Sequence, residues 1–398
     1  MNVEEAARQI LNDPYNSLVF DAAHGIELYL VGGYTRNMLA GRTSRDRDYV
    51  FRGSVEGIVN QILPETQGRL IRLGREGLNR IVLRDGGTLD FTPLREDIQR
   101  DLALRDLTIN SIAWSPSSGW IDPEGGMGDL ERGLIKMVDP RNLTLDPLRL
   151  LRAYRFAAEF SFDIEPVTRS FLNKFSLLIR KTKSERITSE FFKILNLNNP
   201  ANTIHESLAD NLLPQLIRNT YGNLEPKVKA LRNIYSLSSS TLLKYRIKED
   251  EIFSQGLSHK GLLALEILLQ GLPNHHFVLS SRILKRLSRL AKAEEFIGQQ
   301  PLNELSRETI FEIFEAADDA VPDLLIIMGM SAHVFDLEEY RRIRRRALLT
   351  AEEVKSLLGA GPGPALGNAL RSLRKAEFTG NITTAKDAAL FLRTGRAL

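Results

Sequence analysis

The chain has 398 residues, 43% of them hydrophobic and 26% charged, which is typical of a soluble globular protein with about two to four domains. No apolar run reaches the roughly 18 residues of a transmembrane helix, and the acidic N-terminus lacks a signal-peptide core. Cysteine is absent, which excludes disulfides and thiolate metal sites and fits a cytoplasmic protein. A net charge of +3 allows a nucleic-acid partner without requiring one.

The first 140 residues alternate between short apolar runs and glycine turns, and they predict an α+β region with a mixed sheet and helices. A helix is expected over 34–41 and a glycine-rich loop over 125–133, whereas 107–114 fits either a helix or a strand. The expected strands cover residues 26–31, 47–51, 69–74, 80–85 and 88–94.

After Pro140 the pattern changes to helical periodicity, and strand signals disappear. Segments rich in Asn, Gly and Pro separate the helices at 195–203, 270–276 and 359–368. The second part of the chain is therefore expected to be all-α.

Two aspartates, Asp46 and Asp48, lie two residues apart where the second expected strand begins. Side chains at this spacing in a strand point to one face, so the two carboxylates repel each other and favour a divalent cation. Magnesium suits them, and two ions about 3.5–4 Å apart would assist phosphoryl transfer. Asp90, in the strand 88–94, is the candidate third carboxylate. Alternatively, the pair decorates an exposed edge strand.

Gly32 and Gly33 follow a strand and precede a helix. Backbone N–H groups can approach a phosphate closely at such a turn, and the helix dipole favours an anion. Arg36, one turn into the helix, is expected to reach the same phosphates. An ordinary strand-to-helix turn is the alternative, but the nearby aspartate pair favours a phosphate site.

A second polar cluster is expected at Arg105, Asp106 and Asn110. Asp and Asn side chains suit ribose hydroxyls. Asp106 fits a helix cap and Asn110 a buried structural residue equally well.

The segment 146–160 predicts a helix with Asp146 as its N-cap and Pro147 in its first turn. Asp146 offers an acceptor and Arg149 offers donors to the edge of a base, and two further arginines can neutralise phosphates. A solvated charged face is the alternative, but the missing acidic partners at i,i+4 count against it. Steps of three residues align Asp146, Arg149, Arg152 and Arg155 on one side. The core side carries Leu150, Leu151, Tyr154, Ala157 and Ala158.

Four segments carry a resemblance to a known family, in the order 31–50, 104–114, 146–164 and 184–195. Together they resemble the class II tRNA nucleotidyltransferases and bacterial poly(A) polymerases of the DNA polymerase beta nucleotidyltransferase superfamily. The segment 361–373 is similar to a tail element of tRNA-acting members. The resemblance implies a catalytic head, a base-recognising neck, a body and a tRNA-binding tail, at 1–140, 141–200, 201–300 and 301–398.

The resemblance also implies roles for individual residues. The two aspartates of the pair would hold the metal ions, and Asp106 would contact the ribose. Asp146 and Arg149 match an amino-acid template that pairs with the incoming base, while Arg152 and Arg155 would assist with phosphates. The implied triphosphate contacts are Gly32, Gly33 and Arg36. Glu185 and Arg186 match a motif that supports the neck helices.

Three positions depart from the family pattern. Asn37 stands where the family usually has Asp, Leu104 where it has Arg, and Leu145 where it has Glu. The change at Leu104 removes any contact made by the Arg side chain, but none of the three changes removes an expected metal ligand.

A further departure bears on the nucleotide. Members that make complete CCA ends have a flexible loop after the third carboxylate, and this loop is implied to switch the template from CTP to ATP. Here Asp90 is followed almost directly by Arg105, and the intervening 95–103 resembles the start of a helix. The resemblance therefore favours a CC-adding enzyme that acts on the 3′ end of tRNA and needs a separate A-adding enzyme. The alternatives are a complete CCA-adding enzyme, a poly(A) polymerase, an A-adding enzyme and a non-catalytic RNA-binding protein.

Two basic segments in the helical part are expected to bind RNA through its phosphates. Solvated helix faces with nearby glutamates are the alternative. The candidate residues are Arg282, Lys285, Arg286, Arg289, Arg341, Arg342 and Arg345.

Overall fold

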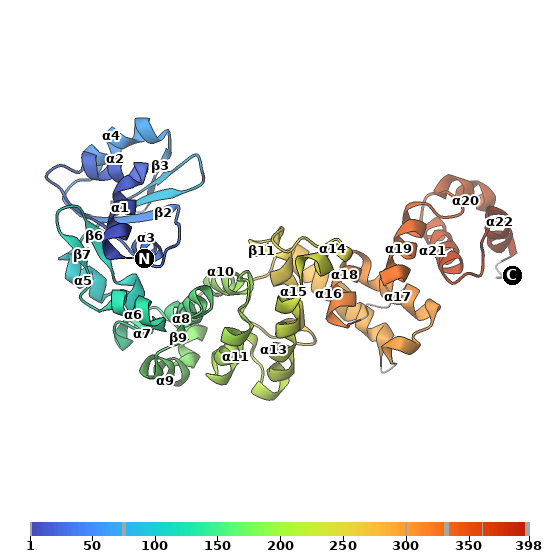
Figure 1. The fold of residues 1–398 in the computed structure, drawn as a ribbon. Helices are drawn as coiled ribbons and strands as arrows, with labels where there is room; N and C mark the ends of the chain where they lie inside the picture. The colour runs from blue at the N-terminus through green and yellow to red at the C-terminus, as the bar shows by residue number, and fades with distance from the viewer. Residues whose placement is uncertain (1, 74–76, 299–300, 330–333, 360, 395–398) are drawn as a thin grey trace. The chain divides into compact units, whose positions relative to one another are not determined.

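The computed structural model describes residues 2–73, 77–298, 301–329, 334–359 and 361–394, and its fold is drawn in Figure 1. The chain forms two compact units, Met1–Tyr221 and Gly222–Leu398. An N-terminal mixed sheet with helices is followed by a largely helical remainder, as the sequence pattern predicts. The finer division into four parts stays a prediction. Among the described residues, no helix combines the length and the apolar character needed to cross a bilayer.

A seven-stranded sheet lies in the first unit, in the order β3-β4-β5-β2-β1-β6-β7. Neighbouring strands are antiparallel except β2 and β5, which run parallel. The strands predicted from the sequence are confirmed to within a few residues. Their bounds are β1 (Glu27–Val31), β2 (Asp46–Arg52), β3 (Arg69–Leu73), β4 (Leu78–Val82), β5 (Thr88–Pro93), β6 (Ala113–Ser115) and β7 (Gly119–Ile121).

The two faces of the sheet pack against different helices, which Figure 1 shows on opposite sides. One face carries Tyr49 and Phe91, whose rings stack with centroids 5.1 Å apart. The other face carries Val50, and because side chains alternate along a strand, Asp46 and Asp48 share it. The helices of the first face include α1 (Val3–Asn12), α2 (Pro14–Ala22) and α4 (Glu56–Thr66). The second face packs against α5 (Ile98–Ala103).

Two local predictions need correction or refinement. The expected glycine-rich loop at 125–133 is wrong, because this segment forms α6 (Gly126–Arg132). Gly125 and Gly133 flank that helix with φ of +72° and +68°, so these two glycines are its caps. The ambiguous segment 107–114 is a short 3₁₀ helix, η1 (Thr108–Asn110), followed by β6.

The rest of the first unit is helical, apart from β8 (Leu134–Ile135) and β9 (Asp163–Ile164), which pair in parallel. The predicted helix at 146–160 is confirmed as α8 (Leu148–Phe160), but the expected N-cap is wrong, because Pro147 is the N-cap and Asp146 is the C-cap of the preceding helix. Ala158 is only half-buried, and Phe156 and Phe160 join the buried side. The helix α3 (Gly33–Leu39) follows β1 as expected. The other helices are α7 (Pro140–Leu145), α9 (Pro166–Lys174), α10 (Ser184–Leu195), α11 (Ala201–Ala209) and α12 (Leu212–Ile217).

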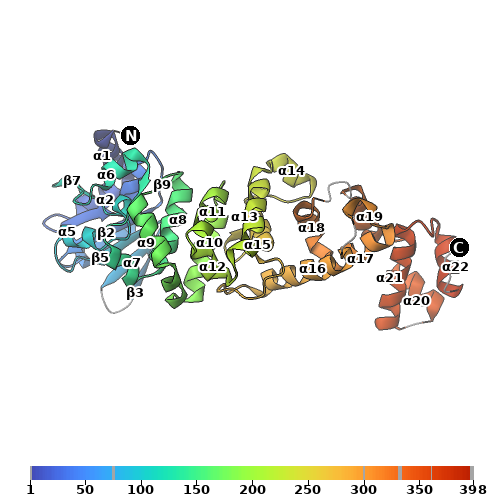
Figure 2. The same ribbon diagram turned by 90° about the horizontal axis from the view of Figure 1, so that it is seen from below.

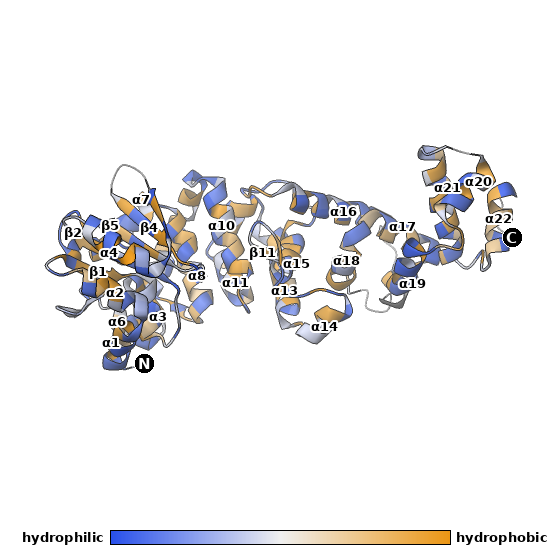
Figure 3. Cartoon of the chain, turned by 90° about the horizontal axis from the view of Figure 1, so that it is seen from above, coloured by the Kyte–Doolittle hydropathy of each residue, from blue (hydrophilic) through white to orange (hydrophobic). Residues whose placement is uncertain are grey.

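The second unit is helical except for the short pair β10 (Ile252–Ser254) and β11 (Leu257–Ser258). Hydrophobic and hydrophilic residues alternate around most of its helices in Figure 3, as expected for helices with one buried side. Figure 2 shows α20, α21 and α22 gathered at the C-terminal end. The helices are α13 (Tyr221–Ser236), α14 (Ser239–Lys244), α15 (His259–Leu269), α16 (Ser281–Ile297), α17 (Arg307–Ala317), α18 (Val321–Ile327), α19 (Val334–Arg345), α20 (Ala351–Leu358), α21 (Pro364–Phe378) and α22 (Ala385–Thr394).

Candidate active site

A pocket of about 780 Å³ in the first unit gathers the predicted site residues, and we call it the carboxylate pocket. Its walls come from β2, β5, α3, α8 and α10 and from the segment around η1. Every residue predicted for the catalytic and nucleotide-binding sites lines it, namely Gly32, Gly33, Arg36, Asp46, Asp48, Asp90, Arg105, Asp106, Asn110, Asp146, Arg149, Arg152 and Arg155. Residues from positions 32 to 155 of the chain therefore meet in one cavity.

The aspartates lie on one face because β2 and β5 are in register. Asp48 is paired with Asp90 across the parallel strands, and Asp46 with Thr88. The Thr88 hydroxyl donates a hydrogen bond of 3.0 Å to Asp46. Burial raises the pKa of Asp48, and the nearby charge of Asp90 raises it further, while Arg105 opposes both effects. Burial and a like charge therefore disfavour the ionised form of Asp48, and a bound cation would offset both effects.

Asp90 has a partner that the sequence analysis missed. Arg80 stands opposite Asp90 on the antiparallel neighbour β4, and its Nε donates a hydrogen bond of 2.7 Å to Asp90 Oδ1. Its Nη2 donates a second hydrogen bond to Oδ2, so the contact is bidentate. Only the register of β4 against β5 brings these residues together, and the sequence has no local signal for it.

The donor set fits a magnesium site that is built from a pair of carboxylates. Within the part of the chain that the structure describes, no three His, Cys, Asp or Glu side chains form a metal-binding group. Magnesium is usually held by one or two carboxylates and completed by waters and substrate phosphates. Asp46 and Asp48 meet that requirement, whereas Asp90 is held by Arg80.

Gly32 and Arg36 stand beside the aspartates. Gly32 has φ of +71°, a conformation that favours glycine, and a Cβ there would lie 3.7 Å from Asp48 Oδ2. Arg36 is buried against the rings of Phe156 and Phe160, with its guanidinium carbon 4.6 and 5.0 Å from the ring centres. Burial lowers the pKa of Arg36 to about 10.

A buried polar network continues from Arg36 along the wall of the carboxylate pocket. Asn110 accepts a hydrogen bond from Arg36 and donates one of 2.8 Å to Asp106. Asp106 also accepts from Arg152 Nε at 2.6 Å. Burial alone would raise the pKa of Asp106, but Arg152 and Asn110 outweigh that effect and lower it. Their buried position at the pocket is compatible with the expected ribose contact and with a structural role for Asn110. The helix-cap alternative for Asp106 is wrong, because Leu107 is the N-cap of η1 and has no side-chain cap bond.

The two expected template residues, Asp146 and Arg149, are engaged with protein groups. Arg186 donates hydrogen bonds of 3.1 and 2.8 Å to the two carboxylate oxygens of Asp146. Burial alone would raise the pKa of Asp146, but Arg186 lowers it. Arg149 Nη1 donates a hydrogen bond of 2.8 Å to the backbone carbonyl of Leu104. The side chains of Leu104 and Leu145, which depart from the family pattern, remain exposed at 47% and 81%.

Most cations of the pocket have a carboxylate partner. Arg155 pairs with Glu159 at i,i+4 and with Glu190, so the expectation that α8 lacks such partners is wrong for this residue. The other pairs are Arg80–Asp90, Arg105–Asp101, Arg152–Asp106, Arg186–Asp146 and Lys193–Glu190. Among the described residues, Arg36 and Arg149 are the two pocket guanidinium groups without a carboxylate partner.

The basic residues of the second unit lie outside this pocket. The RNA-contact prediction is wrong for Arg286, because its side chain is 5% exposed and is held by Asp323 and Glu266. Arg289 and Arg341 are partly exposed and bonded to carboxylates, Arg289 to Asp318 and Asp319 and Arg341 to Glu338. The exposed candidates are Arg282, Lys285, Arg342 and Arg345.

Comparison with known proteins agrees with this arrangement. A family profile described as "Poly A polymerase head domain" matches residues 87–136. A second, described as "Probable RNA and SrmB- binding site of polymerase A", matches residues 161–220.

Similar proteins extend over nearly the whole chain. The CC-adding tRNA nucleotidyltransferase of Geobacter sulfurreducens is 27% identical over 96% of this chain and 95% of its own length. The A-adding tRNA nucleotidyltransferase of Deinococcus radiodurans is 27% identical over 92% of this chain and 94% of its own length. A solved structure of the Thermotoga maritima CCA-adding enzyme in complex with tRNA shares the fold, with a TM-score of 0.76 and 19% identity over 99% of this chain and 98% of that one. The chain belongs to the class II tRNA nucleotidyltransferase and poly(A) polymerase family.

Proposed function

We propose that the protein is a template-independent RNA nucleotidyltransferase that adds two cytidines, taken from CTP, to the 3′ end of tRNA and releases pyrophosphate. The carboxylate pocket carries the proposal, because it combines two adjacent carboxylates, two guanidinium groups without carboxylate partners and an acceptor–donor pair at the start of α8. Solved relatives described as bound to tRNA and to CTP support the substrate class.

Asp46 and Asp48 would hold magnesium in this reaction. When bound, Mg²⁺ neutralises phosphate charge and orients the reacting oxygens. Thr88 orients Asp46 through its hydrogen bond, and a bound cation would offset the burial and the Asp90 charge that raise the pKa of Asp48. Arg36 would bind the triphosphate, because its guanidinium group has no carboxylate partner among the described residues and lines the pocket.

Asp146 and Arg149 would select the base. The Watson–Crick edge of cytosine has an amino donor beside acceptors, which matches one carboxylate and one guanidinium group. In the structure Arg186 bonds to both oxygens of Asp146, and one nitrogen of Arg149 donates to the Leu104 carbonyl. Cytosine would pair with Asp146 and with the remaining donors of Arg149, so a base that offers the wrong pattern would leave a polar group unpaired.

The restriction to cytidine is proposed from the short connection after β5. Leu94, Ile98 and Leu102 of this connection are buried in one cluster with Tyr29, Val31, Val50 and Ala113. A segment fixed by three core side chains does not supply a free loop that moves the template. The similar proteins include CC-adding, A-adding and multifunctional CCA enzymes, so their names leave this restriction to experiment.

The test is the length of the product made on a tRNA that lacks its 3′ end. With CTP alone, and equally with CTP and excess ATP, the product is expected to stop after two cytidines. Terminal A addition at a rate comparable to C addition would refute the restriction and favour a complete CCA-adding enzyme. Absence of any CMP incorporation in magnesium, with tRNA binding intact, would favour a non-catalytic RNA-binding protein.

An insertion tests the reason for the restriction. Residues 95–97 are exposed between the buried Leu94 and Ile98, so a loop from a CCA-adding relative can be inserted there with the core left in place. We expect some terminal A addition from this variant. A glycine–serine insertion of equal length is the control, and A addition by both variants would mean that loop length alone matters.

A further inference from the structure

A second cavity of the first unit, which we call the aromatic pocket, has no role in the function proposed above. Its volume is about 690 Å³, within the roughly 300–1,000 Å³ of small-molecule sites. It is formed by the N-terminus of α1, the end of α3, the helix α6 and the junction of α8 with β9. None of its lining residues also lines the carboxylate pocket.

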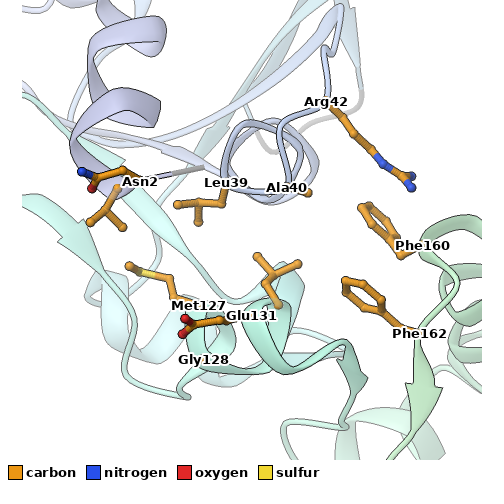
Figure 4. A pocket seen from close by; sticks show the side chains of 11 residues that line it. Asn2, Leu39, Ala40, Arg42, Met127, Gly128, Glu131, Phe160 and Phe162 are labelled. Atoms are coloured by element: carbon orange, nitrogen blue, oxygen red, sulfur yellow. The ribbon is translucent and has the colours of Figure 1, made fainter.

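The walls of the aromatic pocket are partly apolar and carry two aromatic rings. Phe160 and Phe162 lie at one end in Figure 4, with ring centroids 5.4 Å apart and planes tilted by 39°. Leu39 and Met127 lie at the other end in the same view. Such walls suit a planar ring that can stack on a phenyl group.

Two charged side chains stand at the rim. The guanidinium carbon of Arg42 lies 4.2 Å from the centre of the Phe160 ring, and Nη1 donates a hydrogen bond of 2.9 Å to the Glu159 carbonyl. Its other nitrogens have no acceptor among the residues that the structure describes, and Glu131 likewise has no ion pair there. Both side chains are exposed. The rim therefore offers free donors on one residue and a free acceptor on another.

We propose that the aromatic pocket binds a nucleobase. A base combines two apolar faces with an edge that carries donors and acceptors, and proteins bind unpaired bases by stacking them on aromatic side chains. The base would stack on Phe162, accept a hydrogen bond from Arg42 and donate from an exocyclic amino group to Glu131. It is supplied either by an unpaired nucleotide of the RNA or by a free nucleotide.

The two pockets share a structural connection. Phe160 lines the aromatic pocket and contacts Arg42, and its ring centre also lies 5.0 Å from the guanidinium carbon of Arg36 in the carboxylate pocket. The short helix α3 carries Arg36 on one pocket and Leu39 on the other.

The first measurement is equilibrium dialysis of the full chain with labelled cytidine or adenosine, with no tRNA and no CTP, because the cytosine of CTP would compete for the aromatic pocket. One saturable equivalent of nucleoside is expected. Phe162→Ala is expected to weaken that binding by about tenfold, because a stacking platform is lost. Phe175→Ala is the matched control, since this half-buried ring stacks on Phe171 and lines neither pocket.

Glu131→Ala provides a variant that does not depend on core packing, because Glu131 is exposed. Wild type should prefer cytidine and adenosine over uridine, since only the first two have an exocyclic amino group, and the variant should lose this preference. Uniform binding of all three nucleosides by wild type would contradict the contact with Glu131.

The source of the base is determined with tRNA. If Phe162→Ala weakens tRNA binding about tenfold, and 4-thiouridine in tRNA crosslinks to residues 127–131 or 160–162, the base comes from RNA. If tRNA binding is unchanged while nucleoside binding is lost, the base comes from a free nucleotide. If Phe162→Ala changes neither nucleoside binding nor tRNA affinity, the proposal is overturned. None of these readouts requires C addition, so the failure of the proposed function is recognised separately.

Discussion

Arginines are abundant both in the carboxylate pocket and along α16 and α19, and each region combines cations that are paired with carboxylates and cations that are not. In the pocket, Arg36 and Arg149 have no carboxylate partner among the described residues. Along α16, Arg286 and Arg289 are bound by acidic residues of other segments. A run of basic residues in the sequence therefore reports charge content, whereas the three-dimensional pairing determines how much of that charge is available to phosphate.

The largest effect on activity is expected at the carboxylates of the pocket. Asp48→Ala, and likewise Asp46→Ala, should abolish transfer of CMP to tRNA in magnesium, because loss of a direct ligand exceeds the roughly 10–100-fold effect of losing an indirect one. The measurement is incorporation of labelled CMP. Circular dichroism and tRNA binding should remain close to wild type. Activity above about a few per cent of wild type would contradict the metal assignment.

Arg286→Ala tests a cation that is bound by buried carboxylates. Asp323, with a side chain that is 0% exposed, would be left as a buried charge without its main partner, which destabilises the fold by about 3–5 kcal/mol. Urea unfolding of the full chain gives this value. Lys285→Ala, one residue earlier and exposed, is the matched control and should change stability by less than about 0.5 kcal/mol. Equal stability of the two variants would show that the buried pair has no structural role.

Arg149→Ala tests a cation of the carboxylate pocket that has no carboxylate partner among the described residues. Loss of one partner in base selection should reduce the preference for CTP over UTP by about 1–3 kcal/mol, with less effect on tRNA affinity. The ratio of kcat/KM for the two nucleotides is the readout. Arg152→Ala is not equivalent, because Arg152 is bound to the buried Asp106 and its loss should lower stability. If selectivity in Arg149→Ala equals that of wild type, Asp146 and Arg149 are not the template.

The buried Glu266, which lies beside Arg286, is expected to make the stability of the fold depend on pH. Burial raises the pKa of Glu266 well above its ordinary value, and the neighbouring Asp323 adds to the rise. The folded chain therefore holds this proton more tightly than the unfolded chain, so stability falls as pH rises from the ordinary glutamate pKa through the raised one. Glu266→Gln should remove this part of the pH dependence and gain stability relative to wild type over that window. If the free energy of unfolding varies with pH in the same way for wild type and Glu266→Gln, the raised pKa is contradicted.

The smallest effect is expected at exposed cations of the second unit. Lys285 and Arg345 have no ion pair within the described part of the chain. If either binds an RNA phosphate, its replacement by Ala should reduce the slope of log affinity against log salt by about 0.7–0.9. Arg341→Ala should change the slope less, because Arg341 is already bound to Glu338. If all three variants keep the wild-type slope, these residues of α16 and α19 do not bind RNA phosphates.

The sequence predicts the sheet and the location of the pocket well, because both depend on local patterns. Alternating side chains place Asp46 and Asp48 on one face, and the periodicity of 146–160 identifies the buried side of α8. Ordered motifs identify the remaining pocket residues. The glycines at 125 and 133 were misleading, since the same residue type serves loops and helix caps.

Long-range pairing could not be predicted. Arg80 meets Asp90 only through the register of β4 against β5, and Arg286 meets Asp323 only through the packing of α16 near α18. Both pairs join positions that have no fixed sequence spacing. The same limit applies to the aromatic pocket, whose walls come from four separate elements.

All residues that line the carboxylate pocket lie within Met1–Tyr221. Ribosomes synthesise chains from the N-terminus at about 5–20 residues per second, and domains generally fold as units in that order. The growing polypeptide can therefore complete the carboxylate pocket while α16 and α19 are still untranslated. Substitutions in the half that is synthesised later can then change the surface of the second unit without disturbing the assembly of the carboxylate pocket.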